Sequence, residues 1–352
     1  MSTNQSLSPI SRQLPCNPEE LDEFLSRPSN AVAQVVAGMS GPVLVLGAGG
    51  KIGLHLSLML RRAFDMIGKP NSVIAVSRFQ TLRSRESFET LGVTAHTCDL
   101  TNPADLASLP DKATVFFLAG VKFGTAESPE KLRMINVELP RLVANRFARS
   151  RIVAFSTGCV YPFVSAGSGG ATEATPVAPL GDYATSCVDR ERAFTEASRI
   201  NGTATALVRL NYSVEFRYGL LVDIAEKVLR GERIDVTTGY VNAIWQSDAV
   251  AHCIQAADLA AASSTPINIT GAEILSVRML ALRFGELFSR QVRITGTEEK
   301  TAWLSDASRS HALFGPPPTS LENMMQWIAA WLLIGGHTWG KPTGFERRDG
   351  RF

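Results

Sequence analysis

The chain has 352 residues, of which 45% are hydrophobic and 19% charged, so it can bury a large core in one big domain or two. Its 35 basic and 33 acidic residues leave a net charge of +2, too small an excess to indicate a nucleic acid or an acidic membrane as partner. The five cysteines are too few for a disulfide scaffold and lack metal-ligand spacing, which favours a reducing, cytoplasmic location and no bound metal.

Neither end of the chain carries a membrane signal. Met1 to Pro15 is polar, lacks the basic-then-apolar order of a secretory signal, and looks disordered. Trp327 to Ile334, the longest late apolar run, is far too short to span a bilayer. We therefore expect no membrane partner.

The N-terminal part predicts two short helices, near 18–26 and 29–38, ahead of the first strand. Asn17 suits the cap position and Pro18 the first helical position. From residue 41 the pattern alternates between strand and helix. Strands are expected at 43–46, 72–76, 93–97, 114–118, 151–155 and 204–210. This alternation is typical of an α/β, Rossmann-type fold, a doubly wound parallel sheet with helices on both faces.

The first of these strands leads into a glycine-rich turn, Gly47-x-x-Gly50-x-x-Gly53, which also contains Gly49, Lys51 and Ile52. A helix follows from His55. Glycine lets the backbone approach a pyrophosphate closely, and the start of a helix offers it free N–H groups. The turn therefore predicts a dinucleotide site, with an ordinary glycine-rich turn between strand and helix as the alternative.

After residue 210 the alternation loosens. Helices are expected at 219–230, 247–261, 276–288 and 321–333, and strands at 233–237, 241–245, 266–270 and 292–295. We divide the chain into an N-terminal helical extension (1–40), a dinucleotide-binding domain (41–210 plus about 241–262), and a smaller α+β substrate-binding region (211–240 and 263–352). The basic tail 335–352 is either solvated surface or a cover for the active-site mouth or a neighbouring subunit.

The residues at the ends of the second and third strands suggest which groups of the nucleotide they would contact. An acid after the second strand would bond the ribose hydroxyls of NAD, but Ser77 and Arg78 stand there and suit a 2′-phosphate. NADP(H) is therefore favoured over NAD(H), unless Arg78 is a surface residue without a ligand. Asp99, followed by Leu100, ends the third strand and could either accept a bond from the adenine amino group or cap the next helix.

Two further segments, 155–162 with Thr157 and 179–187 with Tyr183, carry a family resemblance. With the glycine turn in front of them, the sequence from about 43 to about 333 resembles the extended short-chain dehydrogenase/reductase superfamily, the NAD(P)-dependent epimerases and dehydratases. The resemblance implies that Thr157 and Tyr183 are catalytic. It also implies cofactor contacts from Asp99, the loop Leu118-Ala119-Gly120-Val121-Lys122 (similar to that of UDP-galactose 4-epimerases), Asn136 and Leu210, and substrate contacts from Thr157, Asn211 and Arg217.

One departure from this family concerns the active site. Members of the family have the motif Tyr-x-x-x-Lys, in which the lysine holds the nicotinamide ribose and lowers the pKa of the tyrosine. This chain has Cys187 at the lysine position. Lys122 is our candidate to replace part of the missing charge, and a plain cofactor contact is its alternative role. A second departure is that the substrate half lacks the pattern used for a uridine or thymidine diphosphate. A smaller sugar, sugar acid or hydroxy acid is at least an equal candidate.

The resemblance implies an NAD(P)-dependent oxidoreductase, epimerase or dehydratase that acts on a hydroxyl of a small carbohydrate-like substrate. Tyr183 would take the hydroxyl proton while hydride passes to the nicotinamide, and Thr157 would bond the reacting oxygen. The alternative is a non-catalytic dinucleotide-binding sensor or scaffold that lost turnover with the lysine. The resemblance further implies a homodimer formed by the helices near 126–149 and 183–200, whose apolar residues include Met134, Leu142, Val143 and Phe147.

Overall fold

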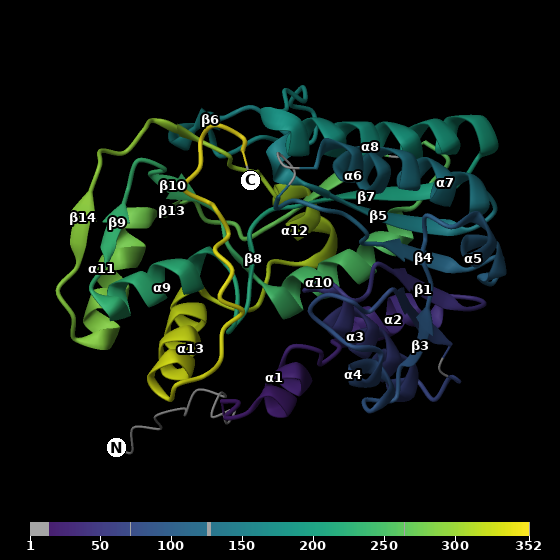
Figure 1. Cartoon of the computed structure of the whole chain (residues 1–352), viewed down its shortest axis with the longest axis horizontal. Coiled ribbons are helices and arrows are strands. Elements are labelled where there is room, and N and C mark those ends of the chain that lie inside the picture. Colours follow the sequence, from purple (N-terminus) through teal and green to yellow (C-terminus); the bar gives the residue numbers. More distant parts are fainter. Residues whose placement is uncertain (1–13, 71, 125–127, 264, 352) are drawn as a thin grey trace, which may run out of the picture.

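The computed structural model describes residues 14–70, 72–124, 128–263 and 265–351, so the disorder expected for 1–15 falls mostly outside the described residues. Its centre is a seven-stranded sheet in the order β12-β7-β5-β4-β1-β2-β3 (Figure 1). All of its pairings are parallel. The strands are β1 (Val43–Leu46), β2 (Val73–Ser77), β3 (Thr94–Thr97), β4 (Thr114–Phe117), β5 (Arg151–Thr157), β7 (Ala204–Leu210) and β12 (Pro266–Ile269). The predicted doubly wound α/β fold is confirmed.

Helices cover both faces of this sheet because its central strands are apolar on both sides. In β1, Val43 and Val45 pack in one core cluster, whereas Leu44 and Leu46 pack in the cluster on the opposite face. The first face carries α2 (Asn30–Ala37), α3 (Gly53–Met66), α4 (Arg85–Glu89) and α10 (Gln246–Gln255). The second carries α5 (Pro103–Ser108), α6 (Pro129–Arg133), a π-helical turn (Met134–Glu138), α7 (Leu139–Arg146) and α8 (Gly181–Asn201).

A third core lies between the remaining helices, α1 (Pro18–Phe24), α9 (Leu220–Arg230), α11 (Val277–Phe288) and α13 (Leu321–Leu333). Three pairs of short strands pack on it: β8 (Ser213–Val214) with β11 (Ile244–Trp245), β9 (Arg233–Asp235) with β14 (Arg293–Thr295), and β10 (Tyr240–Val241) with β13 (Leu275–Ser276). A fourth pair, β6 (Val164–Ser165) with β15 (Thr301–Ala302), lies outside this core. The helix α12 (Ser308–Phe314) follows β15. Asn17 caps α1 as predicted, by accepting a bond from the backbone N–H of Glu20.

The structure corrects two expectations in this part of the chain. The strand expected at 241–245 is divided between β10 and β11, which belong to different sheets. Residues 266–269, which our division gave to the substrate-binding region, form β12 at the edge of the central sheet by pairing with β7. The dinucleotide-binding sheet therefore takes its last strand from beyond the point where we ended it.

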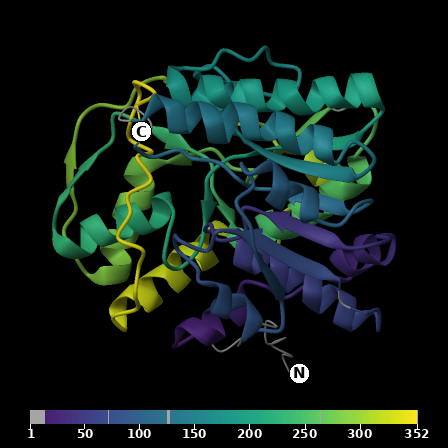
Figure 2. The same cartoon turned by 45° about the vertical axis from the view of Figure 1, so that its right-hand side comes forward.

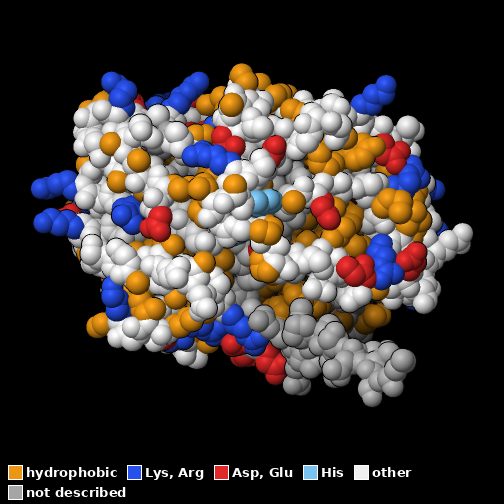
Figure 3. Space-filling model, turned by 180° about the vertical axis from the view of Figure 1, so that it is seen from behind, with side chains coloured by type: hydrophobic (Ala, Val, Ile, Leu, Met, Phe, Trp, Pro, Cys, Tyr) orange, Lys and Arg blue, Asp and Glu red, His pale blue; other side chains and the backbone are white. Residues whose placement is uncertain are grey.

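The C-terminal segment runs back from α13 past α9 toward β6 (Figures 1 and 2). On the face opposite to the one drawn in Figure 1, Lys and Arg side chains are dispersed among acidic and apolar ones (Figure 3). Of the helices within the described residues, none is long and apolar enough to cross a membrane.

Candidate active site

The glycine turn is shaped by contacts that exclude side chains. Gly47 has φ +85, and a Cβ there would lie 2.6 Å from the backbone nitrogen of Ala119. A Cβ on Gly53 would lie 2.1 Å from the Ala48 carbonyl oxygen. Gly50 is open by contrast, with no atom nearer than 3.6 Å to its Cβ position. No side chain caps α3, which starts at Gly53, so no side chain of the protein satisfies its first N–H groups.

A cavity of ≈ 220 Å³ lies across the carboxyl ends of the strands β1 to β4. It gathers nine residues that we predicted to bind the cofactor: Gly47, Gly50, Ser77, Arg78, Asp99, Leu100, Leu118, Ala119 and Gly120. Val121, from the loop that the resemblance implied, lines it as well. Sequence reasoning missed six others: Thr81, Cys98, Thr101, Lys131, Ile135 and Leu139. The carboxyl edge is where doubly wound sheets bind dinucleotides, and the open Gly50 and uncapped α3 fit a pyrophosphate there.

The nucleotide end of this cavity combines a guanidinium with a carboxylate. Arg78 Nη1 lies 3.9 Å from Asp99 Oδ2, and the two side chains are 50% and 41% exposed, so both remain accessible to a ligand. Thr101 donates two hydrogen bonds to Asp99 and thereby lowers the pKa of that carboxyl. Asp99 does not cap the next helix, because Asn102 caps α5. Gly49 packs against Ser77, since a Cβ on Gly49 would lie 2.8 Å from Ser77 Oγ.

Asn136 lies beneath the cavity rather than in it, which corrects its assignment as a cofactor contact. Its side chain is fully buried in the π-helical turn. The amide bonds both backbone groups of Val121 at 2.9 Å, donates to Ser186 and accepts from Arg190. Asn136 therefore fixes the loop after β4 against α8, and acts on the site only through that loop.

The predicted catalytic residues lie where β5 meets the first turns of α8. Thr157 ends β5, and its hydroxyl accepts a 3.2 Å bond from the backbone N–H of Cys159. Tyr183 lies in the first turn of α8, which packs on β5, and its hydroxyl hydrogen-bonds Cys187. Burial, and then Cys187 and Cys159, raise the pKa of Tyr183 well above its ordinary value. The Lys122 ammonium lies 5.9 Å from the Tyr183 ring centroid, and burial lowers its pKa.

Two of the residues predicted to contact the substrate, Arg217 and Asn211, are almost fully buried. Arg217 is 3% exposed and its guanidinium pairs with Glu215 and Asp22. It also lines a cavity of ≈ 320 Å³ between α9 and the tail, so its role as a substrate contact stays a prediction. Asn211 follows Leu210 at the end of β7 and is buried, with a 3.4 Å side-chain bond to Asn242.

Lys51 and Ile52 do not line the 220 Å³ cavity. The Lys51 ammonium lies instead 3.0 Å from the ring centroid of Tyr218, which precedes α9.

The C-terminal tail crosses the mouth of the site. Thr343 accepts a bond from Lys122 and donates two to Asp223 in α9. Farther on, Arg348 bonds Thr301, and Gly350 contacts the backbone of Leu180 and Gly181 just before Tyr183. The tail is therefore not plain solvated surface, because it packs next to the residues predicted as catalytic. Its role as a cover for the active-site mouth stays a prediction.

A Rossmann-type sheet with a glycine turn and a cavity at its carboxyl edge defines a dinucleotide-binding protein. Residues 43–269 match the model of the NAD dependent epimerase/dehydratase family. The chain belongs to this family of enzymes, as the sequence resemblance implied. A comparison with curated proteins gives no match.

Solved structures of three enzymes share the fold. UDP-glucose 4-epimerase from Thermotoga maritima with UDP-glucose is 15% identical, covering 84% of this chain and 99% of that one, with a TM-score of 0.68. DesIV, a dTDP-glucose 4,6-dehydratase from Streptomyces venezuelae with NAD bound, is 17% identical over 83% and 97%, with a TM-score of 0.70. UDP-glucuronic acid 4-epimerase from Bacillus cereus with NAD is 17% identical over 83% and 99%, with a TM-score of 0.69.

Proposed function

We propose that the protein acts on a hydroxyl of a small sugar, sugar acid or sugar derivative by NAD(P)-dependent hydride transfer, with NADP(H) preferred. The observation that carries this is the single cavity at the carboxyl edge of the sheet, which joins the glycine turn to Arg78 and Asp99. Thr157 ends a strand at that same edge. NAD and nucleotide sugars in the similar structures support the cofactor class and a sugar derivative as substrate.

The nicotinamide, when bound, supplies hydride acceptance or donation, and the chain's own residues handle the proton. With its raised pKa, Tyr183 is protonated at neutral pH, the form that donates a proton to a carbonyl oxygen during reduction. Oxidation needs the tyrosinate, which a nearby cation stabilises. The Lys122 ammonium, 5.9 Å from the Tyr183 ring centroid, is the cation that we assign to this task. Thr157 hydrogen-bonds the reacting oxygen in this proposal.

The proposed preference for NADP(H) can be tested by replacing Arg78. NADPH should bind ten- to hundredfold more tightly than NADH, because a charged hydrogen bond to the 2′-phosphate contributes about 1.5–3 kcal/mol. Arg78→Ala should remove most of that difference in a fluorescence titration. Arg85→Ala, an exposed arginine paired with Glu89 on α4, is the matched control. Equal affinities of the wild type for both cofactors would refute the preference.

Turnover separates the enzyme from a non-catalytic sensor or scaffold. Absorbance at the nicotinamide band should change when the dinucleotide complex meets a panel of sugars and sugar acids. Stoichiometric dinucleotide binding without turnover across the whole panel would favour the sensor or scaffold.

We also propose a homodimer in the cytoplasm. All five cysteines are free, which suits a reducing compartment. Of the apolar residues expected at the dimer interface, Met134 and Leu142 are exposed, at 44% and 37%. Val143 and Phe147 are instead buried in the core under α7, so they do not form an interface.

A further inference from the structure

One residue of the C-terminal tail contacts the lysine on which the proposed chemistry depends. Thr343 is 5% exposed, and its carbonyl oxygen accepts a 3.4 Å bond from Lys122 Nζ. The same ammonium lies 5.9 Å from the ring centroid of Tyr183. The family match, residues 43–269, ends before the tail, so it assigns no role to this contact. Thr343 thus lies one contact away from the tyrosine that handles the proton.

Thr343 is itself held by the helix α9. Its backbone N–H and its hydroxyl donate bonds of 2.8 and 2.6 Å to Oδ2 of Asp223. The backbone N–H of Phe345 donates a 3.2 Å bond to Thr343 Oγ1, and the Phe345 ring is buried in the third core. Because these contacts hold the backbone on both sides of the Thr343 carbonyl, Lys122 meets an acceptor in a fixed place.

The rest of the tail joins α9 to the start of α8. It runs past α9 toward β6 (Figure 1). The Arg348 guanidinium donates bonds of 2.7 and 3.0 Å to Thr301. Gly350 packs so closely that a Cβ there would lie 2.3 Å from the carbonyl oxygen of Leu180, just before the helix of Tyr183. The carbonyl that contacts Lys122 therefore belongs to a segment anchored at both of its ends.

The charge state of Lys122 depends on several elements that pack around it. The titratable and charged groups that face it are Tyr183 and Cys187 in α8, Cys159 after β5, Asp223 in α9, Arg347 in the tail and Lys51 in the glycine turn. Burial is the largest cause and lowers the pKa of Lys122, Cys159 with Cys187 and Asp223 opposes that effect, and Arg347 adds to it. Because the tail supplies part of the burial as well as Arg347, its removal should let this pKa rise toward the ordinary value of about 10.4.

We propose that the tail is a working part of the active site, in which Thr343 is a positioning residue that holds the Lys122 ammonium beside Tyr183. This rests on the proposed function and adds the C-terminal segment to the site on which that function depends. Thr343 acts only through Lys122, and Asp223 anchors it from α9. The site is therefore complete only when the tail lies against that helix.

The test follows the reaction of Lys122 with acetic anhydride from pH 7 to 11 and reads it by mass spectrometry. The exposed Lys112, just before β4, serves as the internal reference. Deletion of residues 340–352 should raise the pH midpoint of Lys122 by about one unit or more, because the lysine loses both burial and the charge of Arg347.

Substitutions at Thr343 make the test independent of the deletion. Thr343→Ala should raise the midpoint by a smaller amount, and Thr343→Ser, which keeps the hydroxyl, should match the wild type. Thr338→Ala is the matched control and should leave the midpoint unchanged. Thr338 donates the same kind of bond, at 2.7 Å, to Glu226 in α9, five positions before Thr343. If the deletion variant does not fold, the Thr343 variants decide.

Three results would overturn the inference: a Lys122 midpoint that the deletion and Thr343→Ala leave unchanged, an equal shift in Thr338→Ala, or a Thr343→Ser variant that behaves like Thr343→Ala. NADPH affinity is titrated separately in every variant. A weaker NADPH complex with an unchanged Lys122 midpoint would assign the tail to the cofactor instead. Failure of the wild type to bind NADPH would refute the proposed function, and that result is distinct from any change in the labelling of Lys122.

Discussion

At the residue scale, the proposed chemistry depends on Cys187, which stands where the family has lysine. A thiol buried beside Tyr183 brings no positive charge, so burial raises the pKa of the tyrosine with little to oppose it beyond Arg190. Lys122 approaches the ring from the loop after β4 instead of from the next turn of α8. Lys122 and Tyr183 therefore lie on separate elements, and the loop position sets their separation.

Restoring the family residue tests this arrangement. Cys187→Lys should raise the rate of alcohol oxidation and move the ascending limb of its pH–rate profile to lower pH, because a nearby cation stabilises tyrosinate. Lys122→Met should move that limb to higher pH with little change in cofactor affinity. Cys187→Ser, which changes the side chain without adding charge, is the control in pH–rate profiles. If Lys122→Met instead weakens cofactor binding and leaves the profile unchanged, Lys122 is only a cofactor contact.

At the scale of elements, a buried ionic network joins α1 to the rest of the molecule. Asp22 Oδ1 accepts bonds from His55 at 2.8 Å and from Arg83 and Arg217 at 2.9 Å each. Gln246 contacts the other ring nitrogen of His55. Burial alone would raise the pKa of Asp22, but His55, Arg217 and Arg83 together hold it well below its usual range. This carboxylate therefore links α1 to α3, to the loop after β2 and to the loop before α9.

Asp22→Asn should lower the free energy of unfolding by about 3–5 kcal/mol, because the buried guanidinium of Arg217 and the partly buried one of Arg83 lose their shared counter-charge. The pKa of Asp22 is depressed in the folded state, so its contribution is complete above the unfolded value of about 3.9 and is lost as the pH falls below that value. Urea unfolding from pH 8 to 3 should show a constant gap between wild type and variant that narrows below pH 4. Asp65→Asn, in an exposed pair with Arg61, should change stability by less than about 1 kcal/mol.

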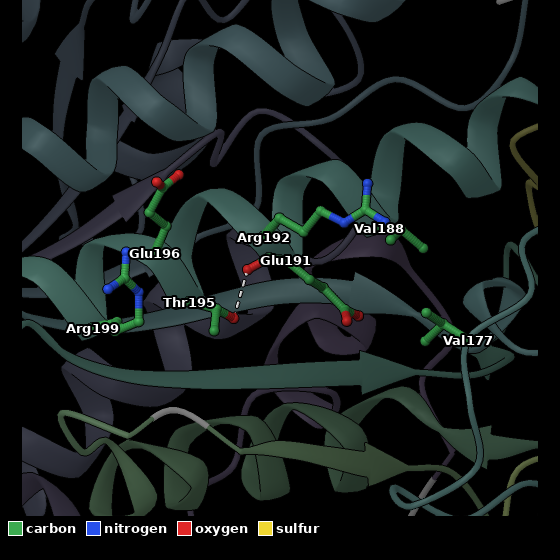
Figure 4. Close-up of a pocket in the computed structure, with 7 residues that line it drawn as sticks. All are labelled: Val177, Val188, Glu191, Arg192, Thr195, Glu196 and Arg199. Atoms are coloured by element: carbon green, nitrogen blue, oxygen red, sulfur yellow. Dashed lines mark hydrogen bonds between the residues drawn. The ribbon is translucent and has the colours of Figure 1, made fainter.

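At the scale of the whole molecule, the helices α7 and α8 form an outer layer on one side of the sheet (Figure 1). Exposed apolar side chains lie along this layer, with Leu142 at 37% and Ile200 at 61% exposure. A cavity of ≈ 400 Å³ along α8 is lined by charged side chains that include Glu191 and Arg192 (Figure 4). A layer that exposes both apolar and charged side chains suits contact with a second copy of the same layer.

Sedimentation at micromolar concentration tests this surface. We expect twice the chain mass of 38.0 kDa, and Leu142→Glu should shift the species toward the monomer. Leu333→Glu, at a 59% exposed position near the end of α13, should leave the dimer intact. A single 38.0 kDa species for the wild type would exclude the dimer.

Local sequence determined most elements of this protein. Apolar β-branched runs predicted β1 and β7 to the residue, and Ser276 predicted the start of α11, because a strand period and a capping side chain act over a few residues. The glycine spacing and the residues after β2 and β3 likewise predicted part of the cavity lining (Gly47, Gly50, Ser77, Arg78, Asp99 and Leu100), since parallel strands bring their carboxyl ends to one edge. The loop after β4 was implied by the family resemblance.

Tertiary structure alone decided which partners these residues have. The Asp22 partner of Arg217 lies 195 positions away, and the ring over which Lys51 lies comes from a loop that follows a different strand. Asn136 matches a family position that predicted a cofactor contact, yet its amide is hydrogen-bonded to the backbone of Val121 in the loop after β4. Such contacts depend on how helices and loops pack around the sheet, and short-range patterns carry no record of that packing.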